Sequence, residues 1–139
     1  MTLLRQQDRG GPTVYSAFGL LKPDSDFTLK EAAQRLAAKF PLFAVEQTAD
    51  AIVVSDAEWE IHLTLNESPA VLDESREIAR HIGGAEDAKD IALCARRVEL
   101  ASDIPDPEMD HFNDYLLAVE VLQSFEGLIA VDPREPSLL

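Results

Sequence analysis

The chain has 139 residues, of which 46% are hydrophobic and 27% charged, and its net charge is −14. These values are typical of one folded domain and exclude a disordered chain. The negative charge disfavours nucleic acid phosphates and anionic lipid as partners, and no apolar run approaches the roughly 20 residues that a membrane span needs.

The first residues of the chain predict no targeting segment. Residues 1–12 lack the apolar core and cleavage site of a secretory signal, so we expect a flexible N-terminal lead there and one domain over residues 13–139. The single cysteine, Cys94, has no partner for an internal disulfide. A reducing cytoplasm is therefore the expected location.

A strand and a helix are predicted first. Residues 14–21 are rich in aromatic and aliphatic side chains, which favours a strand. Thr28 and Glu31 have the spacing of a capping box, and apolar residues then recur at helical intervals over 29–40, where Pro41 ends the pattern.

Three strands are predicted next. Residues 42–47 and 51–55 are joined by a short turn, and residues 59–66 alternate strictly between apolar and polar side chains. Short connections of this kind favour an antiparallel meander, with one face of the last strand on the core and the other in water.

The second half of the chain predicts mainly helices. Residues 68–82 form an amphipathic pattern that Gly83-Gly84 ends, and residues 86–101 predict a further helix, with 97–100 extended as the alternative. A longer apolar helix over 109–125 follows.

Two shorter signals complete the pattern. Asp106-Pro107 has the residues of an N-cap and first turn for the long helix, and residues 128–131 predict a last strand. The resulting order is β-α-β-β-β-α-α-α-β. The simplest packing is a mainly antiparallel sheet of about five strands, covered on one face by about four helices, which is an α+β fold.

An acidic run is the most informative feature for function. Residues 98–133 contain nine Asp or Glu and no Lys or Arg. The candidate interaction surface consists of Asp103, Asp106, Glu108, Asp110, His111 and Asp114. Acids near a helix N-terminus complement its dipole, which explains several of them without a ligand.

A catalytic or metal site is the alternative for the same residues. On a helix, Asp110 and Asp114 share a face and His111 lies three residues before Asp114, so the three side chains suit a divalent cation or a small hydrolase. No His-x-x-x-His or Glu-x-x-His pair supports the metal. We therefore assign no metal, no cofactor and no catalytic residue.

Three residues outside the acidic run are candidates for a catalytic or a core role: His62, Cys94 and Trp59. His62 lies beside Glu60 and Thr64 on the polar face of a strand, where they could form an acid–base pair, but an exposed polar face is the ordinary explanation. Cys94 lies two residues from Arg96, which favours a reactive thiol, although a lone helical cysteine is usually a core residue. Trp59 is expected in the core. Phosphate-binding glycine loops, nucleophile elbows and HExxH are all missing from the sequence.

The sequence therefore favours a non-enzymatic interaction domain, of the immunity or inhibitor kind, that presents an acidic surface to a basic protein. The first alternative is the hydrolase or metal-dependent enzyme. The second is a self-associating subunit, a homodimer, because apolar residues nearly encircle the helix predicted over 109–125.

Overall fold

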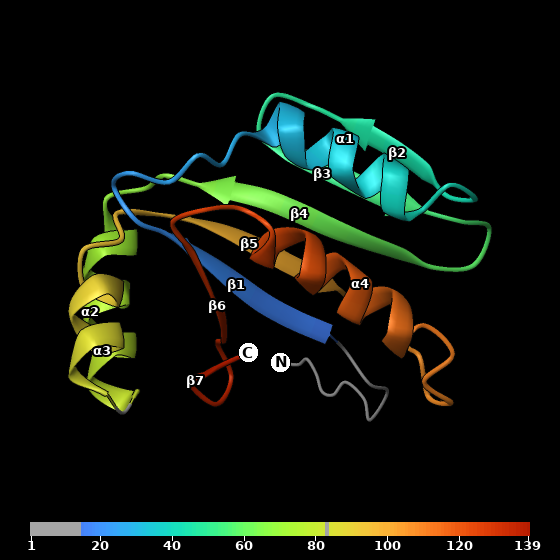
Figure 1. Cartoon of the computed structure of the whole chain (residues 1–139). Helices are drawn as coiled ribbons and strands as arrows, with labels where there is room; N and C mark the ends of the chain where they lie inside the picture. Colours follow the sequence, from blue (N-terminus) through green and yellow to red (C-terminus); the bar gives the residue numbers. More distant parts are fainter. Residues whose placement is uncertain (1–14, 83) are drawn as a thin grey trace.

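Seven strands and four helices make up the part of the chain that the computed structural model describes, residues 15–82 and 84–139 (Figure 1). The strands are β1 (Tyr15–Leu21), β2 (Ala44–Gln47), β3 (Ala51–Ser55), β4 (Glu60–Asn66), β5 (Arg96–Ser102), β6 (Leu128–Asp132) and β7 (Ser137–Leu138). The helices are α1 (Leu29–Lys39), α2 (Ala70–His81), α3 (Ala85–Ile91) and α4 (Phe112–Gln123). The predicted α+β class is confirmed, and the predicted lead over 1–12 lies outside the described residues.

All seven strands belong to one antiparallel sheet, in the order β2-β3-β4-β5-β1-β6-β7. The meander expected for the three strands that follow α1 is confirmed, since β3 pairs with β2 and β4. The strand β5 enters the middle of the sheet between β4 and β1. The beginning of β1 and the end of β5 therefore lie at the same end of the sheet, where Tyr15 pairs with Ser102.

Helices cover both faces of the sheet rather than one, which corrects the packing expected from the sequence. In β1, Ala17 and Leu21 belong to the main core with α1 and α4. Leu20 points to the opposite face, because side chains alternate along a strand, and it packs there with Val131 and with Ile91 of α3. The helices α2 and α3 cover this opposite face at one end of the sheet, and the second core lies beneath them (Figure 1).

The helix α1 forms where the sequence predicts it. The Thr28 hydroxyl accepts the N–H of Glu31, and Leu29, Ala32 and Leu36 are buried. Local capping and one apolar stripe are enough to specify this element.

Residues 96–102 form a strand, so the helix predicted over 86–101 is wrong in its second half. The helix α3 ends at Ile91, and β5 begins at Arg96 after a turn. Val98 and Leu100 are buried in the main core, while Arg97 is buried beneath α2. The alternation over residues 97–100 is only four residues long and directly follows a helical pattern, so the sequence alone does not separate a strand from a continued helix.

The helix α4 begins at Phe112, later than the sequence predicts. Its buried residues form one stripe along the helix: Tyr115, Ala118, Val119, Val121 and Leu122. Phe112 and Leu117, beside this stripe, are partly buried against the main core. Burial within the monomer thus accounts for most of the apolar surface that suggested a dimer. Across residues 15–82 and 84–139, none of the helices has the length and hydropathy of a membrane span.

Candidate functional site: an acidic pocket beside Trp59 and His111

The predicted acidic residues lie mostly in a loop, residues 103–111, that joins β5 to α4. Only Asp114 belongs to the first turn of the helix. The N-cap position is taken by His111, whose side chain makes no capping hydrogen bond, so the capping role predicted for Asp106 is wrong. The helix dipole therefore does not explain the acids of this loop.

Asp106 instead organises the 103–111 loop from inside. Its carboxylate is 4% exposed and accepts the backbone N–H groups of Asp110 (3.1 Å) and His111 (2.9 Å). The hydroxyl of Tyr15, from β1, donates to the same carboxylate over 2.6 Å. A tertiary contact thus holds Asp106 inward, which a local reading of the sequence cannot foresee.

The hydrogen bonds to Asp106 determine its charge state. Burial alone would raise the pKa of Asp106, but the bonds from Tyr15, His111 and Asp110 outweigh burial and lower it. Burial, the bond to Asp106 and the nearby negative charges raise the pKa of Tyr15 to about 12. The pair therefore consists of a carboxylate and a neutral phenol at neutral pH.

His111 lies flat against Trp59 at the start of β4. The two rings are parallel within 1° and their centroids are 4.6 Å apart. Nδ1 of His111 is 2.9 Å from Oδ2 of Asp114, so a carboxylate there favours the tautomer that carries its proton on Nδ1. The indole N–H of Trp59 is buried and has no hydrogen-bond partner among the described residues.

These residues enclose a small pocket of about 150 Å³. Its lining comes from the turn between β3 and β4 and from the 103–111 loop: Glu58, Trp59, Pro105, Asp106, Pro107, Glu108, Asp110 and His111. Four of the eight are acidic, and no Lys or Arg is among them. The structure thus brings together Asp106, Glu108, Asp110 and His111 of the predicted surface, with Asp114 attached through His111. Asp103 is exposed and does not line the pocket.

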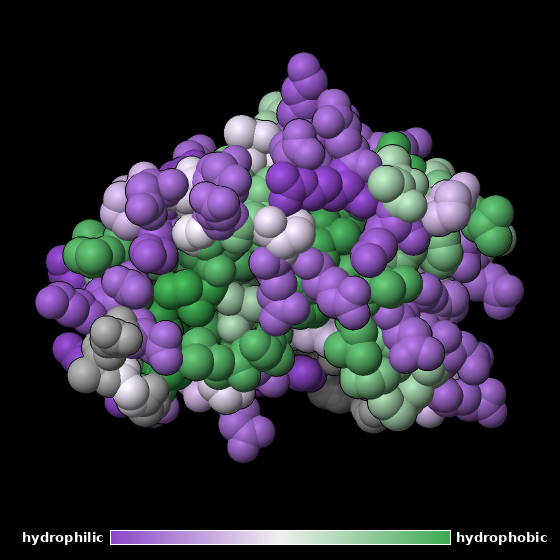
Figure 2. Space-filling view, viewed as in Figure 1, coloured by the Kyte–Doolittle hydropathy of each residue, from purple (hydrophilic) through white to green (hydrophobic). Residues whose placement is uncertain are grey.

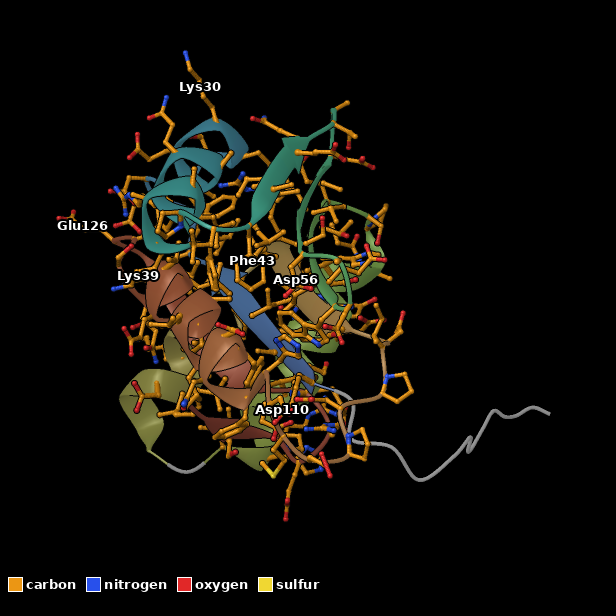
Figure 3. All side chains as sticks on the ribbon, turned by 90° about the vertical axis from the view of Figure 1, so that its right-hand side faces the viewer. Lys30, Lys39, Phe43, Asp56, Asp110 and Glu126 are labelled. Carbon is orange, nitrogen blue, oxygen red and sulfur yellow. The ribbon has the colours of Figure 1, made fainter. Side chains whose placement is uncertain are left out.

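Glu58 and Trp59 complete the pocket, although they lie outside the acidic run from which the surface was predicted. A signal for them exists in the sequence, because residues 40–75 contain eight acids and no Lys or Arg, like residues 98–133. The fold places the β3–β4 turn of the first run against the 103–111 loop of the second. In Figure 3, Asp56 lies near the middle of the view and Asp110 below it, away from Lys30 at the top and Lys39 at the left, both of α1.

We call this surface the acidic end. Its exposed acids are Asp56, Glu58, Asp103, Glu108 and Asp110. No ion pair joins any of them to a Lys or Arg within the described ranges. Among the basic side chains that the structure describes outside β5, most lie on α1 and α2, and four of these pair with acids of those helices or their neighbours: Arg35, Lys39, Arg76 and Arg80. The acidic end is therefore a surface of exposed acids without a basic side chain paired to them.

Metal chemistry finds little support in this arrangement. In the part of the chain that the structure describes, no three His, Cys, Asp or Glu side chains are grouped so as to hold a metal ion. Asp106 is occupied by its three donors, and the imidazole of His111 by Asp114 and Trp59.

The other two sequence candidates lie apart from the pocket. His62 and Glu60 do pair, at 3.1 Å, but their side chains are 47% and 40% exposed on the open face of the sheet. Cys94 is fully buried in the second core, where burial and the Asp90 carboxylate, opposed by Lys22, raise the pKa of its thiol to about 11. An exposed pair and a buried neutral thiol are both ordinary structural features.

A larger pocket of about 330 Å³ lies beneath α2, at the opposite end of the sheet. Its polar floor is Arg97, whose guanidinium pairs with Glu74 (2.7 Å) and Glu99 (2.8 Å) and lies 4.1 Å from the centre of the Phe18 ring. These contacts already occupy the guanidinium and hold α2 against the sheet. We therefore assign Arg97 to structure rather than to ligand binding.

Comparison of the chain with protein-family models, with curated proteins and with solved structures finds no significant match in any of the three.

Proposed function

We propose that this protein is a non-enzymatic interaction domain whose acidic end binds a basic protein, in the manner of an immunity protein or an inhibitor, in the cytoplasm. The observation that carries the proposal is the convergence of two base-free stretches, 40–75 and 98–133, around one pocket without a Lys or Arg. Unpaired surface acids make the net charge more negative and oppose a compact fold through their mutual repulsion. They therefore do not stabilise folding, whereas a basic partner would neutralise them.

The same charge favours proteins over nucleic acids as partners. Phosphate groups approaching the acidic end meet Asp56, Glu58 and Asp110 without any compensating cation. A basic protein surface is attracted over roughly 8 Å at physiological salt, which speeds its association.

The test measures binding of a fluorescent twelve-residue peptide rich in Lys and Arg. The triple variant Asp103→Asn, Glu108→Gln, Asp110→Asn removes three charges from the acidic end. We expect its affinity to fall roughly tenfold at low salt, because three exposed charge contacts contribute about 0.2–1 kcal/mol each. The wild-type affinity should also fall steeply as salt is added.

A matched control removes the same charge elsewhere. Asp24, Asp26 and Glu126 are exposed and lie near the other end of α4 and the β1–α1 connection. The variant Asp24→Asn, Asp26→Asn, Glu126→Gln should bind nearly as well as wild type. Equal losses in the two triple variants would show that net charge alone acts, and would contradict the proposal.

A small hydrolase is the second candidate, and the His111–Asp114 contact of 2.9 Å is the observation that favours it. A carboxylate that holds Nδ1 leaves Nε2 able to accept a proton from water. No Ser, Thr, Cys or Lys lines the pocket, so the nucleophile would be a water molecule activated by His111, the imidazole itself or a pocket carboxylate. Turnover of p-nitrophenyl acetate that His111→Asn abolishes would support this candidate; equal turnover in wild type and variant would remove it.

Self-association is the third candidate, and exposed apolar residues near the C-terminal strand favour it. Leu116, Leu138 and Leu139 are 39%, 45% and 47% exposed, and Leu116 and Leu139 line a groove of about 260 Å³ along α4. Figure 2 shows hydrophobic residues on this face where Figure 1 places β6 and β7. Light scattering at high concentration decides the matter, since a mass of 15.3 kDa would exclude the dimer.

A further inference from the structure

The pocket beneath α2 has the size and the walls of a site for a small molecule. Its volume is about 330 Å³, and sites for small ligands generally start at about 300 Å³. A cavity of about 150 Å³ already holds benzene, so this pocket has room for one ring with a short side chain. It lies at the opposite end of the sheet from the acidic end and shares no lining residue with the pocket there.

The walls of this pocket are apolar and come from three parts of the fold. They are formed by half-buried side chains of β1, of α2 and of the turn between β6 and β7: Phe18, Ile78, Pro133 and Pro136. Phe18 and Ile78 also pack against the second core, which holds these two walls in place. The two prolines add apolar surface and have no backbone N–H to donate. The walls therefore favour a ligand with an apolar body.

The polar lining of the pocket comes mainly from one face of α2. Its members recur at intervals of three and four residues along the helix: Glu74, Glu77, Ile78 and His81. Glu74 uses one carboxylate oxygen for Arg97 and Glu77 uses one for Arg80, both over 2.7 Å. The second oxygen of each carboxylate has no hydrogen bond within residues 15–82 and 84–139. Two acceptors thus remain on this side of the pocket.

His81 supplies a third acceptor. Its Nδ1 lies 3.0 Å from the backbone carbonyl oxygen of Glu77, and a carbonyl oxygen can only accept. In the neutral imidazole Nδ1 therefore carries the proton, and Nε2 keeps a lone pair.

The charge of the lining disfavours an anionic ligand. Arg97 is the one Lys or Arg among the lining residues that the structure describes, and two carboxylates, Glu74 and Glu99, already neutralise it. In the adjoining turn, Arg134 lies 3.8 Å from the Asp132 carboxylate. A ligand with a positive charge and N–H donors suits this lining better than a carboxylate does.

We propose that the pocket beneath α2 binds a small primary amine with an apolar body about the size of one aromatic ring. The body lies among the four apolar walls, and the ammonium group donates to the free carboxylate oxygens of Glu74 and Glu77. Arg97 keeps its structural contacts and forms the floor. This site gives the protein a second binding function, separate from the acidic end.

Nuclear magnetic resonance of the isotope-labelled full chain tests the ligand class through the methyl signals of Ile78. The probes are phenethylamine, 2-phenylethanol and phenylacetate, which share a ring and a short chain but differ in the charge of the head group. Each is titrated to about 10 mM, where an affinity of about 1 mM nearly saturates the site. We expect saturable shifts with the amine, roughly threefold weaker binding of the alcohol, and no saturable shift with phenylacetate.

Ethylamine controls for simple attraction of cations to an acidic protein. It keeps the ammonium group and lacks the ring, so it leaves the apolar walls uncovered and should cause no saturable shift at Ile78. Physiological salt screens the remaining long-range attraction.

Two acids of α2 provide a matched pair of variants. Asp73 and Glu77 are both exposed, and each pairs with the arginine three residues later, but only Glu77 lines the pocket. Glu77→Gln should weaken phenethylamine about threefold, as expected for one exposed charge contact, and leave 2-phenylethanol unchanged. Asp73→Asn should weaken the amine by less than about 1.5-fold. Circular dichroism verifies the fold of both variants.

Several results would overturn the amine site. These are equal effects of the two variants, phenylacetate binding as tightly as phenethylamine, or amine-induced shifts at the acidic end instead of at Ile78. The binding of the basic twelve-residue peptide is a separate measurement with variants at the other end of the sheet. Failure of the amine site therefore leaves the proposed function standing, and failure of the peptide test leaves the amine site standing.

Discussion

The hydroxyl of Tyr15 donates a 2.6 Å hydrogen bond to the buried carboxylate of Asp106, a residue 91 positions later in the sequence. The bond joins β1 to the 103–111 loop and leaves Asp106 able to accept two backbone N–H groups of that loop. The ring of Tyr15 also stacks on Tyr115 of α4, with centroids 5.0 Å apart. One side chain therefore holds the strand, the loop and the helix that border the pocket.

Replacing Asp106 should destabilise the protein. Asp106→Asn can keep a carbonyl oxygen for Tyr15 and His111, which share one carboxylate oxygen, but its NH₂ then faces the N–H of Asp110 and the negative charge is lost. We therefore expect a loss of about 1–3 kcal/mol in the free energy of unfolding at pH 7. Urea denaturation measures the loss. The exposed control Asp110→Asn should change the free energy by less than about 0.5 kcal/mol.

The same substitution should also change how steeply the free energy of unfolding falls at acid pH, the acid limb of its pH dependence. The pKa of Asp106 is lowered from its ordinary value of 3.8, so the folded state binds this proton more weakly than the unfolded state. Its contribution to stability is therefore complete above about pH 4 and is lost as the pH falls below that value. Asp106→Asn should reduce the slope of this limb, and an unchanged slope would contradict the assignment.

Tyr15 should make the free energy of unfolding fall at alkaline pH, whereas Asp106 makes it fall at acid pH. Its pKa is raised to about 12 from 10.0, so the folded state holds the proton more tightly and the contribution is present below pH 10. Between pH 10 and 12 the protein should lose about 3 kcal/mol from this group. Tyr15→Phe should lack that loss, although it should be less stable at pH 7 by about 1–2 kcal/mol. Identical alkaline limbs would refute the role of Tyr15.

Two adjacent arginines should respond differently to truncation. Arg97 is 8% exposed and pairs with Glu74 and Glu99, so Arg97→Ala should cost about 2–3 kcal/mol and loosen α2. Arg96 is more exposed and lies 3.7 Å from Glu67, so Arg96→Ala should cost less than about 1 kcal/mol. Thermal unfolding of both variants measures the difference. Equal costs would show that the contacts of Arg97 contribute nothing special.

Cys94 should be unreactive in the folded protein. Its pKa of about 11, against an ordinary 9.0, reduces the thiolate fraction roughly 100-fold near pH 8, and burial adds to this protection. Labelling with an aromatic disulfide reagent should therefore be at least roughly 100-fold slower than in urea. Fast labelling of the native protein would mean that the second core opens readily.

Two glycines with left-handed backbone should differ in their tolerance of alanine. Gly127 has φ +74°, and a Cβ there would lie 2.7 Å from the Cα of Ser25, so Gly127→Ala should cost about 2–4 kcal/mol. Gly84 has φ +95° but its nearest neighbour, the Asp87 carboxylate, would be 3.5 Å away, so Gly84→Ala should cost about 1 kcal/mol. Urea denaturation tests the order, and a reversal would show that backbone strain outweighs the close approach.

Elements with one exposed face were predictable from the sequence. The helix α1 has a single apolar stripe, β4 alternates strictly, and β3 is a short apolar run between turn residues. Their observed bounds agree with the predicted ones within one or two residues. Neighbouring residues in the chain carry the whole signal in such cases. The α+β class follows from the same signals.

The strand β5 illustrates the opposite case. Val98 and Leu100 enter one core while Arg97 is buried by pairing with Glu74 of α2. The alternation over residues 97–100 is too short to decide between helix and strand, and partners on β1 and β4, distant in sequence, decide that the segment is extended.

The acidity of the 98–133 run was a property of the sequence alone, and so was the expectation of a basic partner, because charges can be counted without a fold. Whether the acids converge was decided only by tertiary structure. The β3–β4 turn and the 103–111 loop are about 50 residues apart, and sheet pairing brings them to one end of the molecule. The buried bond from Tyr15 then holds Asp106 inward and keeps it from capping α4, because a buried carboxylate needs donors that only a distant strand supplies.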